Sequence, residues 1–202
     1  MVLLAGVTVA QAAPRAIILS FGDSLSAAHG LRTEQGWVAL LQQRLRTLGY
    51  GYDTVNASIS GETSGGGLVR LQRALDLHHP AIVMLELGAN DGLRGLPVAG
   101  TRDNLARMIQ MSQQAGAQVL LLGIKLPPNY GPRYGRDFAA MYGELAAHYH
   151  AALVPFMLDR VALDPRLMQD DQLHPDAAGE PIVLDNIWPH LLPLLRRDHP
   201  GH

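Results

Sequence analysis

Apolar and polar positions along the chain follow two alternating patterns, one with the length of strands and one with the spacing of helices. Five short runs, most of them apolar, have the length of strands, and the first contains the β-branched pair Ile17-Ile18. They span residues 16–21, 52–56, 81–87, 118–122 and 152–154, and the last is the shortest. Between them, apolar residues recur every three or four positions. This alternation predicts a βαβ chain with a mostly parallel sheet.

Helical periodicity fills the intervals between these runs. One apolar stripe starts at Trp37 and stops before Gly49, and another follows Thr63 or Ser64, either of which can cap a helix. A third stripe can begin at Thr101 as its N-cap, and a fourth precedes the last strand. Each stripe gives a helix one apolar face to lay against a sheet. We therefore expect a single doubly wound domain.

The two ends of the chain lie outside this pattern. Segment 181–197 is apolar enough to pack, but Pro189 leads us to expect a kink or break near that residue. Residues 198–202 are interpreted as a tail, which leaves one domain over 14–197.

Residues 1–12 are mostly apolar and end in a small-x-small triplet typical of a signal-peptidase site, although they lack the basic residues with which a signal peptide usually starts. We interpret them as a signal-peptide remnant, which predicts a periplasmic or secreted bacterial protein; an ordinary N-terminal strand or tail is the alternative.

Composition narrows the classes of partner. The 202 residues are 48% hydrophobic and 17% charged, as in ordinary globular proteins, and suffice for one domain with its own core. The 16 basic and 18 acidic residues give a net charge of -2 without a block of like charges, so we expect no nucleic-acid partner. No later apolar run approaches the ~20 residues of a membrane helix, so we expect no stable membrane insertion. The absence of cysteine excludes disulfides and thiolate chemistry. The sequence does not set the oligomeric state, and a monomer is the expectation.

The stretch GDSLS at 22–26 follows the first predicted strand directly. A side chain at the carboxyl end of a strand in an open parallel sheet faces the crevice where such sheets bind ligands. Ser24 is therefore placed to act as a nucleophile, provided that a base, an orienting acid and oxyanion donors lie nearby. The alternative is a turn in which Asp23 or Ser24 only caps the next helix.

Two further loops follow predicted strands and offer hydrogen-bond donors to the same crevice. The stretch NASISGETS provides the backbone amide of Gly61, and the stretch GAND provides the side-chain amide of Asn90. Turn chemistry alone also favours Asn-Asp-Gly after a strand, and we expect Asp91 to brace its loop. The glycines at 65–67 suggest a phosphate loop, but no Lys-Ser/Thr pair follows them.

A base can come from the polar stretch before the last helix. Asp171 precedes His174 by three residues, and a carboxylate on one ring nitrogen leaves the other free to take a proton from a serine. His29 is nearer to Ser24 in sequence, but it lacks an evident acid partner. The aspartates around His174 also suggest a metal site, but neither a His-Glu-x-x-His helix nor an EF-hand loop is present. We expect no metal and no cofactor.

In chain order, these four stretches resemble the sequence blocks of the GDSL, or SGNH, family of serine hydrolases. The resemblance runs from the first predicted strand to near the C-terminus. It implies a flavodoxin-like three-layer α/β/α sandwich with a five-stranded, mostly parallel sheet. It also implies Ser24 as nucleophile, His174 as base with Asp171 as its partner, and an oxyanion hole from Ser24, Gly61 and Asn90.

Within that family, the stretches NASISGET, NDGLRG and LPPNYG look like the bacterial periplasmic branch of arylesterases, acyl-CoA thioesterases and lysophospholipases. The expected activity is hydrolysis of small acyl esters or thioesters. Apolar residues in the loops after the third and fourth strands suggest a groove for the acyl chain, or alternatively only pack those loops: Leu93, Leu96, Pro97, Leu126, Pro127 and Tyr130. Two other functions stay open, an esterase for sugar O-acetyl groups and a non-catalytic flavodoxin-like binding module.

Overall fold

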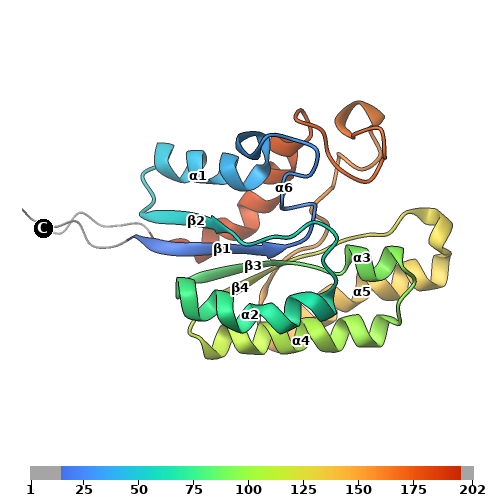
Figure 1. The fold of residues 1–202 in the computed structure, drawn as a ribbon, viewed down its shortest axis with the longest axis horizontal. Helices are drawn as coiled ribbons and strands as arrows, with labels where there is room; N and C mark the ends of the chain where they lie inside the picture. The colour runs from blue at the N-terminus through green and yellow to red at the C-terminus, as the bar shows by residue number, and fades with distance from the viewer. Residues whose placement is uncertain (1–14, 197–202) are drawn as a thin grey trace, which may run out of the picture.

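Five parallel strands form the central sheet in the computed structural model, which describes residues 15–196 (Figure 1). The strands are β1 (Ala16–Gly22), β2 (Tyr52–Asn56), β3 (Ile82–Glu86), β4 (Gln118–Leu122) and β5 (Ala152–Val154). Their order is β2-β1-β3-β4-β5, and every neighbouring pair is parallel. This is the strand order of flavodoxin-like doubly wound sheets. The five predicted strands and the predicted fold class are confirmed.

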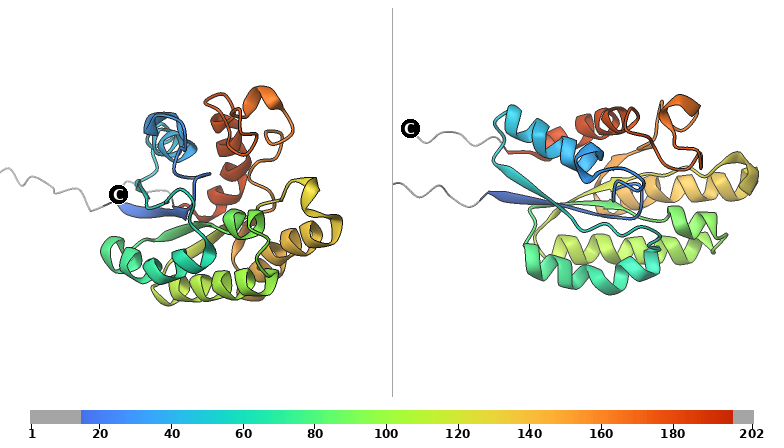
Figure 2. Two further views of the ribbon diagram at one scale, coloured as in Figure 1. Left: turned by 45° about the vertical axis from the view of Figure 1, so that its right-hand side comes forward. Right: turned by 45° about the horizontal axis from the view of Figure 1, so that its top comes forward.

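Helices cover both faces of the sheet. Two helices, α1 (Trp37–Thr47) and α6 (Glu180–Leu191), lie on one face (Figures 1 and 2). Three lie on the other: α2 (Ser64–His78), α4 (Val98–Gln114) and α5 (Pro132–Tyr149). The short α3 (Ala89–Leu93) lies beyond the carboxyl end of β3. The loops at this edge of the sheet carry the residues that the sequence singled out.

The hydrophobic pattern explains why these segments take up these positions. All of β3 is buried, because it lies between β1 and β4 and is covered by helices on both faces. On α1, the buried residues follow helical spacing: Trp37, Val38, Leu41 and Leu45. Thr63 caps α2, as predicted, by accepting a hydrogen bond from the Gly66 amide (3.2 Å).

A buried carboxyl joins the two helices on the α1 face. Glu180, in the first turn of α6, accepts a hydrogen bond from the Trp37 amide at the start of α1 (2.7 Å). Burial raises the pKa of Glu180 to about 7, against the lowering effect of this hydrogen bond. The N-terminal ends of α1 and α6 therefore meet at one side chain.

Two helix features differ from the sequence-based expectation. The fourth helix begins at Val98, with Pro97 as its N-cap, so Thr101 lies inside the helix and not at its cap. Proline is tolerated at this boundary because its missing amide hydrogen would have no partner within the helix. The last helix is not interrupted at Pro189 but continues to Leu191, after which a 3-10 turn follows. Since this proline stands in the last turn, few helical hydrogen bonds are affected.

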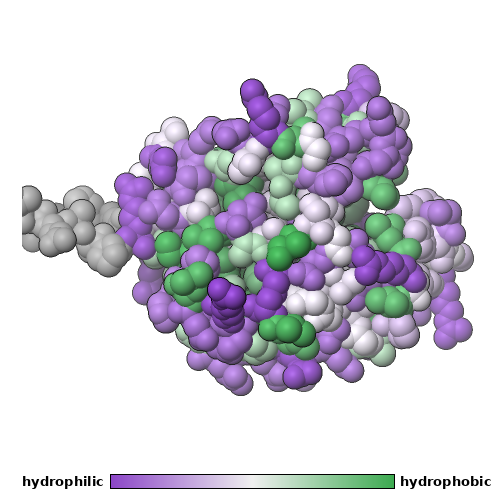
Figure 3. All heavy atoms as spheres, in the orientation of Figure 1, coloured by the Kyte–Doolittle hydropathy of each residue, from purple (hydrophilic) through white to green (hydrophobic). Residues whose placement is uncertain are grey.

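The surface shows no single apolar face in the view of Figure 3, where apolar side chains form separate small groups among polar ones. Within residues 15–196, no helix is both long and apolar enough to cross a bilayer. The predicted signal-peptide remnant, 1–12, and the predicted tail, 198–202, lie outside the described residues.

Candidate active site

Ser24, His174 and Asp171 form a chain of hydrogen bonds at the carboxyl edge of the sheet. The distance from Ser24 Oγ to His174 Nε2 is 2.8 Å, and that from His174 Nδ1 to Asp171 Oδ2 is 2.7 Å. The serine follows β1, whereas the other two residues lie in the long loop between β5 and α6. An imidazole in this position can take a proton from the serine hydroxyl.

The Asp171 carboxylate is fixed by its own loop. Its Oδ1 accepts hydrogen bonds from the amides of Leu173 (2.9 Å) and His174 (3.1 Å), while Oδ2 faces the imidazole. Burial raises the pKa of Asp171, but the bonds from the His174 ring and the two amides outweigh it and lower the pKa to about 2. The carboxylate is therefore ionised at neutral pH and favours the tautomer that carries its proton on Nδ1.

The turn that carries the serine is braced by Asp23, which is fully buried. Its Oδ1 accepts a hydrogen bond from the Leu25 amide (3.1 Å), and its Oδ2 accepts one from the Asn90 side chain (3.0 Å). Burial raises the pKa of Asp23 to about 6, although both hydrogen bonds act to lower it. Asp23 thus links the turn after β1 to the start of α3.

A second buried carboxyl, Glu86, supports the same turn from the end of β3. Its Oε2 accepts hydrogen bonds from the Asp23 amide (3.1 Å) and the Ser26 hydroxyl (2.8 Å). Burial first, and then the charge of Asp23, raise the pKa of Glu86 well above its usual range. A Cβ atom at Gly22 would lie 2.5 Å from Glu86 Oε2, so only glycine fits there. Glu86 was not predicted, although an acid inside an apolar strand is a visible signal in the sequence.

The three predicted oxyanion donors differ in their present partners. Among residues 15–196, the amides of Ser24 and Gly61 donate to no other group. Gly61 has a φ of 81°, which a glycine adopts without strain. The Asn90 side-chain nitrogen donates to both Asp23 Oδ2 (3.0 Å) and the Glu62 carbonyl (3.0 Å). Both of its hydrogens are therefore engaged, and this places the loop of Gly61 beside α3.

Asp91 braces its loop, as expected, and does not face the serine. Its carboxylate accepts hydrogen bonds from the Ser64 amide (2.8 Å) and the Ser64 hydroxyl (2.6 Å). The Thr101 hydroxyl donates to the same carboxylate (3.3 Å). Asp91 thereby ties α2 and α4 to the short helix that carries Asn90.

A cavity of about 470 Å³ opens beside Ser24, Asn90 and His174. Three of the six residues predicted to form an acyl groove line it: Leu93, Leu126 and Pro127. The other three do not, and their positions explain why. The Tyr130 hydroxyl donates to the Leu93 carbonyl (3.0 Å), Pro97 is the N-cap residue of α4, and the Leu96 side chain is exposed at the surface.

The remaining apolar wall of this cavity was not predicted. Besides Leu25, Ala89 and Pro128 near the residues already named, it includes Ile124, Phe156, Leu158, Ala162, Leu163, Met168 and Leu173. Most of these residues follow β5 in a loop without helical or strand periodicity, which is why the hydrophobic pattern did not reveal them. Their position at the carboxyl end of the fifth strand was the signal that was available.

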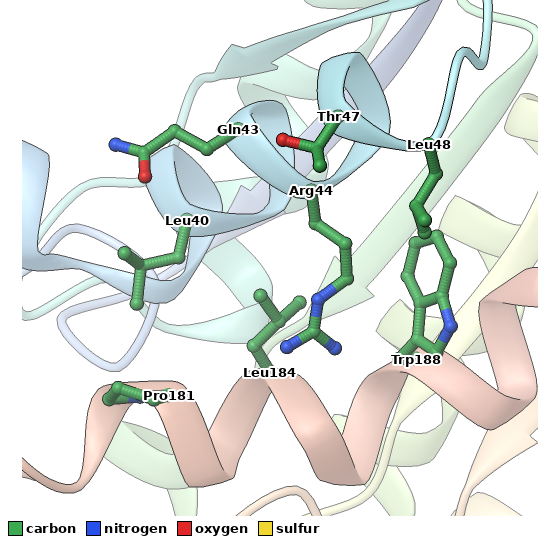
Figure 4. Close-up of a pocket in the computed structure, with 8 residues that line it drawn as sticks. All are labelled: Leu40, Gln43, Arg44, Thr47, Leu48, Pro181, Leu184 and Trp188. Carbon is green, nitrogen blue, oxygen red and sulfur yellow. The ribbon is translucent and has the colours of Figure 1, made fainter.

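A second hollow, of about 510 Å³, lies between α1 and α6 (Figure 4). Leu40 and Leu184 contribute apolar surface, and the Arg44 guanidinium lies 5.4 Å from the centre of the Trp188 ring. Arg44 also forms an ion pair with Asp185 (2.7 Å). No serine, histidine or carboxylate of residues 15–196 lines this hollow. The cavity beside Ser24 is the candidate active site because it contains the hydrogen-bonded serine and histidine.

Comparison with known proteins agrees with this assignment. The sequence profile of the GDSL-like Lipase/Acylhydrolase family matches residues 20–181. Esterase TesA from Pseudomonas aeruginosa is 55% identical over 192 residues, which cover 95% of this chain and 96% of that protein. Thioesterase 1/protease 1/lysophospholipase L1 from Escherichia coli K12 is 41% identical over 188 residues, covering 93% of this chain and 89% of that protein.

Solved structures agree with the sequence matches. The crystal structure of TesA superposes with a TM-score of 0.87 and 56% identity, covering 89% of this chain and 99% of that one. The psychrotrophic esterase EstA from Pseudoalteromonas sp. gives a TM-score of 0.84 and 43% identity over 88% of this chain and 97% of that one. The protein described here belongs to the GDSL-like lipase/acylhydrolase family.

Proposed function

We propose that this protein hydrolyses carboxylic esters and thioesters through an acyl-enzyme on Ser24. The observation that carries the proposal is the hydrogen-bonded chain from Ser24 Oγ through His174 to Asp171. Nε2 takes the hydroxyl proton as Oγ attacks the carbonyl carbon, and the ionised carboxylate stabilises the imidazolium that forms. The imidazolium then protonates the leaving alcohol or thiol, and water releases the acyl group by the same route.

The developing oxyanion is bound by the Ser24 and Gly61 amides and the Asn90 side chain. The first two are free to donate, as oxyanion-hole donors must be. Asn90 joins them by sharing or releasing one of its two present bonds, of which the bond to the Glu62 carbonyl lies in the Gly61 loop.

The apolar cavity supports an acyl chain as the group that it binds. A wall of leucine, proline and phenylalanine side chains buries methylene groups, at about 0.8 kcal/mol for each. The names of the relatives, esterase, arylesterase and thioesterase/lysophospholipase, suggest aryl esters, acyl thioesters and lysophospholipids as substrates. An acetyl group would leave most of the cavity unfilled, which disfavours a sugar O-acetyl esterase.

A periplasmic location, predicted from residues 1–12, is tested by cell fractionation.

Labelling with a fluorophosphonate tests the nucleophile. The wild-type protein should react and Ser24→Ala should not, because Ser24 is the one serine of residues 15–196 whose hydroxyl bonds an imidazole. EstA has been crystallised inhibited by monoethylphosphonate, so probes of this class react with a relative. Labelling that persists in the folded Ser24→Ala variant would exclude Ser24 as the nucleophile.

A chain-length series of p-nitrophenyl esters and acyl-CoAs tests the cavity. Leu126→Asp, which introduces a charge into the cavity wall, should lower kcat/KM for long acyl chains while short ones are hydrolysed nearly as before. Leu96→Asp makes the same change outside the cavity and is the matched control. Equal losses for all chain lengths in Leu126→Asp would exclude this cavity as the acyl site.

A further inference from the structure

His29 places a second imidazole beside the proposed base. The ring centroids of His29 and His174 are 4.5 Å apart, with the ring planes tilted by 40°. The His29 backbone is held on both sides: its amide donates to the Ser24 carbonyl (3.4 Å), and its carbonyl accepts from the Gln169 side chain (2.7 Å). The ring is exposed, and the proposed mechanism gives it no role. A solvent-accessible histidine pair therefore lies at the mouth of the site.

Together with Asp171, these two histidines have the composition of a transition-metal site. One ligand atom from each of the three side chains lies within 4.8 Å of the others. Two imidazoles and a carboxylate are a common zinc ligand set that leaves the fourth position open. Tetrahedral bonds of 2.0–2.2 Å place ligand atoms ~3.3 Å apart, so the side chains must close by roughly 1.5 Å. Rotation of the exposed His29 and Asp171 side chains can provide this movement.

We propose that His29, Asp171 and His174 form an inhibitory binding site for Zn²⁺ and similar transition-metal ions. The inference rests on the proposed function, because inhibition follows from His174 being the base. An ion shared between Asp171 and His174 binds the ring at Nδ1, in place of the present hydrogen bond to the carboxylate. The ring proton then lies on Nε2, which donates toward the serine and has no lone pair left for the Ser24 proton. The ion therefore removes the base, and chelation of the ion restores it.

The ligand set also predicts which ions act. Imidazole nitrogen suits Zn²⁺, Cu²⁺ and Ni²⁺, whereas Mg²⁺ and Ca²⁺ prefer sites made of oxygen atoms. The site offers two nitrogen atoms for each carboxylate, so Mg²⁺ should not compete at similar concentrations.

The test is a Zn²⁺ titration of p-nitrophenyl butyrate hydrolysis, with Mg²⁺ in parallel. His29→Phe removes the ligand but keeps an aromatic ring against His174, and His148→Phe makes the same change at an exposed position at the other end of α5 from the site. Each rate is divided by the metal-free rate of the same variant, so that differences in basal activity between variants do not affect the Zn²⁺ concentration for half inhibition. Zn²⁺ should inhibit the wild-type protein and His148→Phe equally, with recovery on addition of EDTA. His29→Phe should need at least ~10-fold more Zn²⁺ for half inhibition.

Titration calorimetry with Zn²⁺ gives a second measurement that does not depend on turnover. The wild-type protein should show a binding event that is weakened at least ~10-fold in His29→Phe. If the protein hydrolyses no ester, the proposed function fails, and calorimetry still decides whether the site binds metal. Equal inhibition of wild type and His29→Phe, equal inhibition by Mg²⁺, or equal Zn²⁺ binding in both proteins would each overturn the proposal.

Discussion

The two sides of the proposed triad are held in place in opposite ways. Ser24 stands on a turn that is held by two buried carboxyls, since Glu86 connects it to β3 and Asp23 connects it to α3. His174 stands in an irregular loop and depends on hydrogen bonds from residues near it in sequence. Burial raises the pKa of Asp23, whereas hydrogen bonds lower that of Asp171. The nucleophile is thus positioned by the sheet and the base by a few polar contacts, so single polar substitutions should affect the base side most.

The largest effect on kcat is expected from Asp171, the carboxylate that orients His174. Asp171→Asn replaces an ion by a neutral amide that favours the wrong imidazole tautomer, and kcat should fall by ~10⁴. The melting temperature should change little, because the loop is exposed. Asp170→Asn removes the same charge from the neighbouring exposed position and should retain wild-type kcat. A variant Asp171→Asn with more than a tenth of wild-type activity would show that another group orients His174.

On the nucleophile side, Asn90→Ala removes one oxyanion donor and should lower kcat by ~10²–10³ with little change in KM. The loss should be smaller than for Asp171→Asn because two backbone amides remain. Asn104→Ala is the control, since its side chain bonds the Ser64 hydroxyl and not the turn of the nucleophile (3.0 Å). If KM rises and kcat is unchanged, Asn90 binds substrate and not the transition state.

A smaller effect is expected from Gln169, which joins the segment after Ser24 to the loop of His174. Its side chain donates to the carbonyls of His29 (2.7 Å) and Pro175 (2.8 Å), and its backbone amide donates to the His174 carbonyl (2.8 Å). Gln169→Ala should lower kcat by up to ~10² through misplacement of the base. Gln113→Ala, which loses a bond to the Tyr149 carbonyl on α5, is the matched control. Equal activity of both variants would mean that the loop keeps its position without this contact.

The smallest effect concerns stability as a function of pH. The folded protein lowers the pKa of Asp171 to about 2, so its contribution is present above pH 4 and is lost as the pH falls toward 2. Since the side chain is 39% exposed, solvent screening reduces this contribution to about 1 kcal/mol. The difference in unfolding free energy between wild type and Asp171→Asn, measured in urea, should shrink to zero over that range. A difference that is constant with pH would rule out the ionised carboxylate as its source.

Asp23 acts in the opposite direction. Its pKa is raised to about 6 in the folded protein, so the folded state holds this proton more tightly than the unfolded chain does. Stability is therefore lost as the pH rises from about 4 through 6. The contribution of Asp23 to the stability of the fold therefore falls as the pH rises from about 4 to 6, whereas that of Asp171 falls as the pH drops from about 4 to 2.

The fold and the three residues of the proposed triad were predictable for local reasons. Most strands are short apolar runs, Ser24 stands two residues after one of them, and the proposed base and its acid are three residues apart. The remaining features depend on contacts between residues far apart in sequence. The Glu86 bonds span 60 and 63 residues, and the contact of His29 with His174 joins opposite ends of the domain. The engaged hydrogens of Asn90 and the cavity wall after β5 likewise have no local pattern.

The bond between Glu180 and the Trp37 amide has a consequence for synthesis of the chain. The two residues are 143 positions apart, so the first turn of α1 leaves the ribosome long before its carboxyl partner is made. At translation rates of 5–20 residues per second, the delay is roughly 7–30 s. During this interval the nascent α1 also lacks α6, against which it packs in the finished protein. The α1 face is thus the last to be completed, and the nascent chain exposes it to chaperones and proteases the longest.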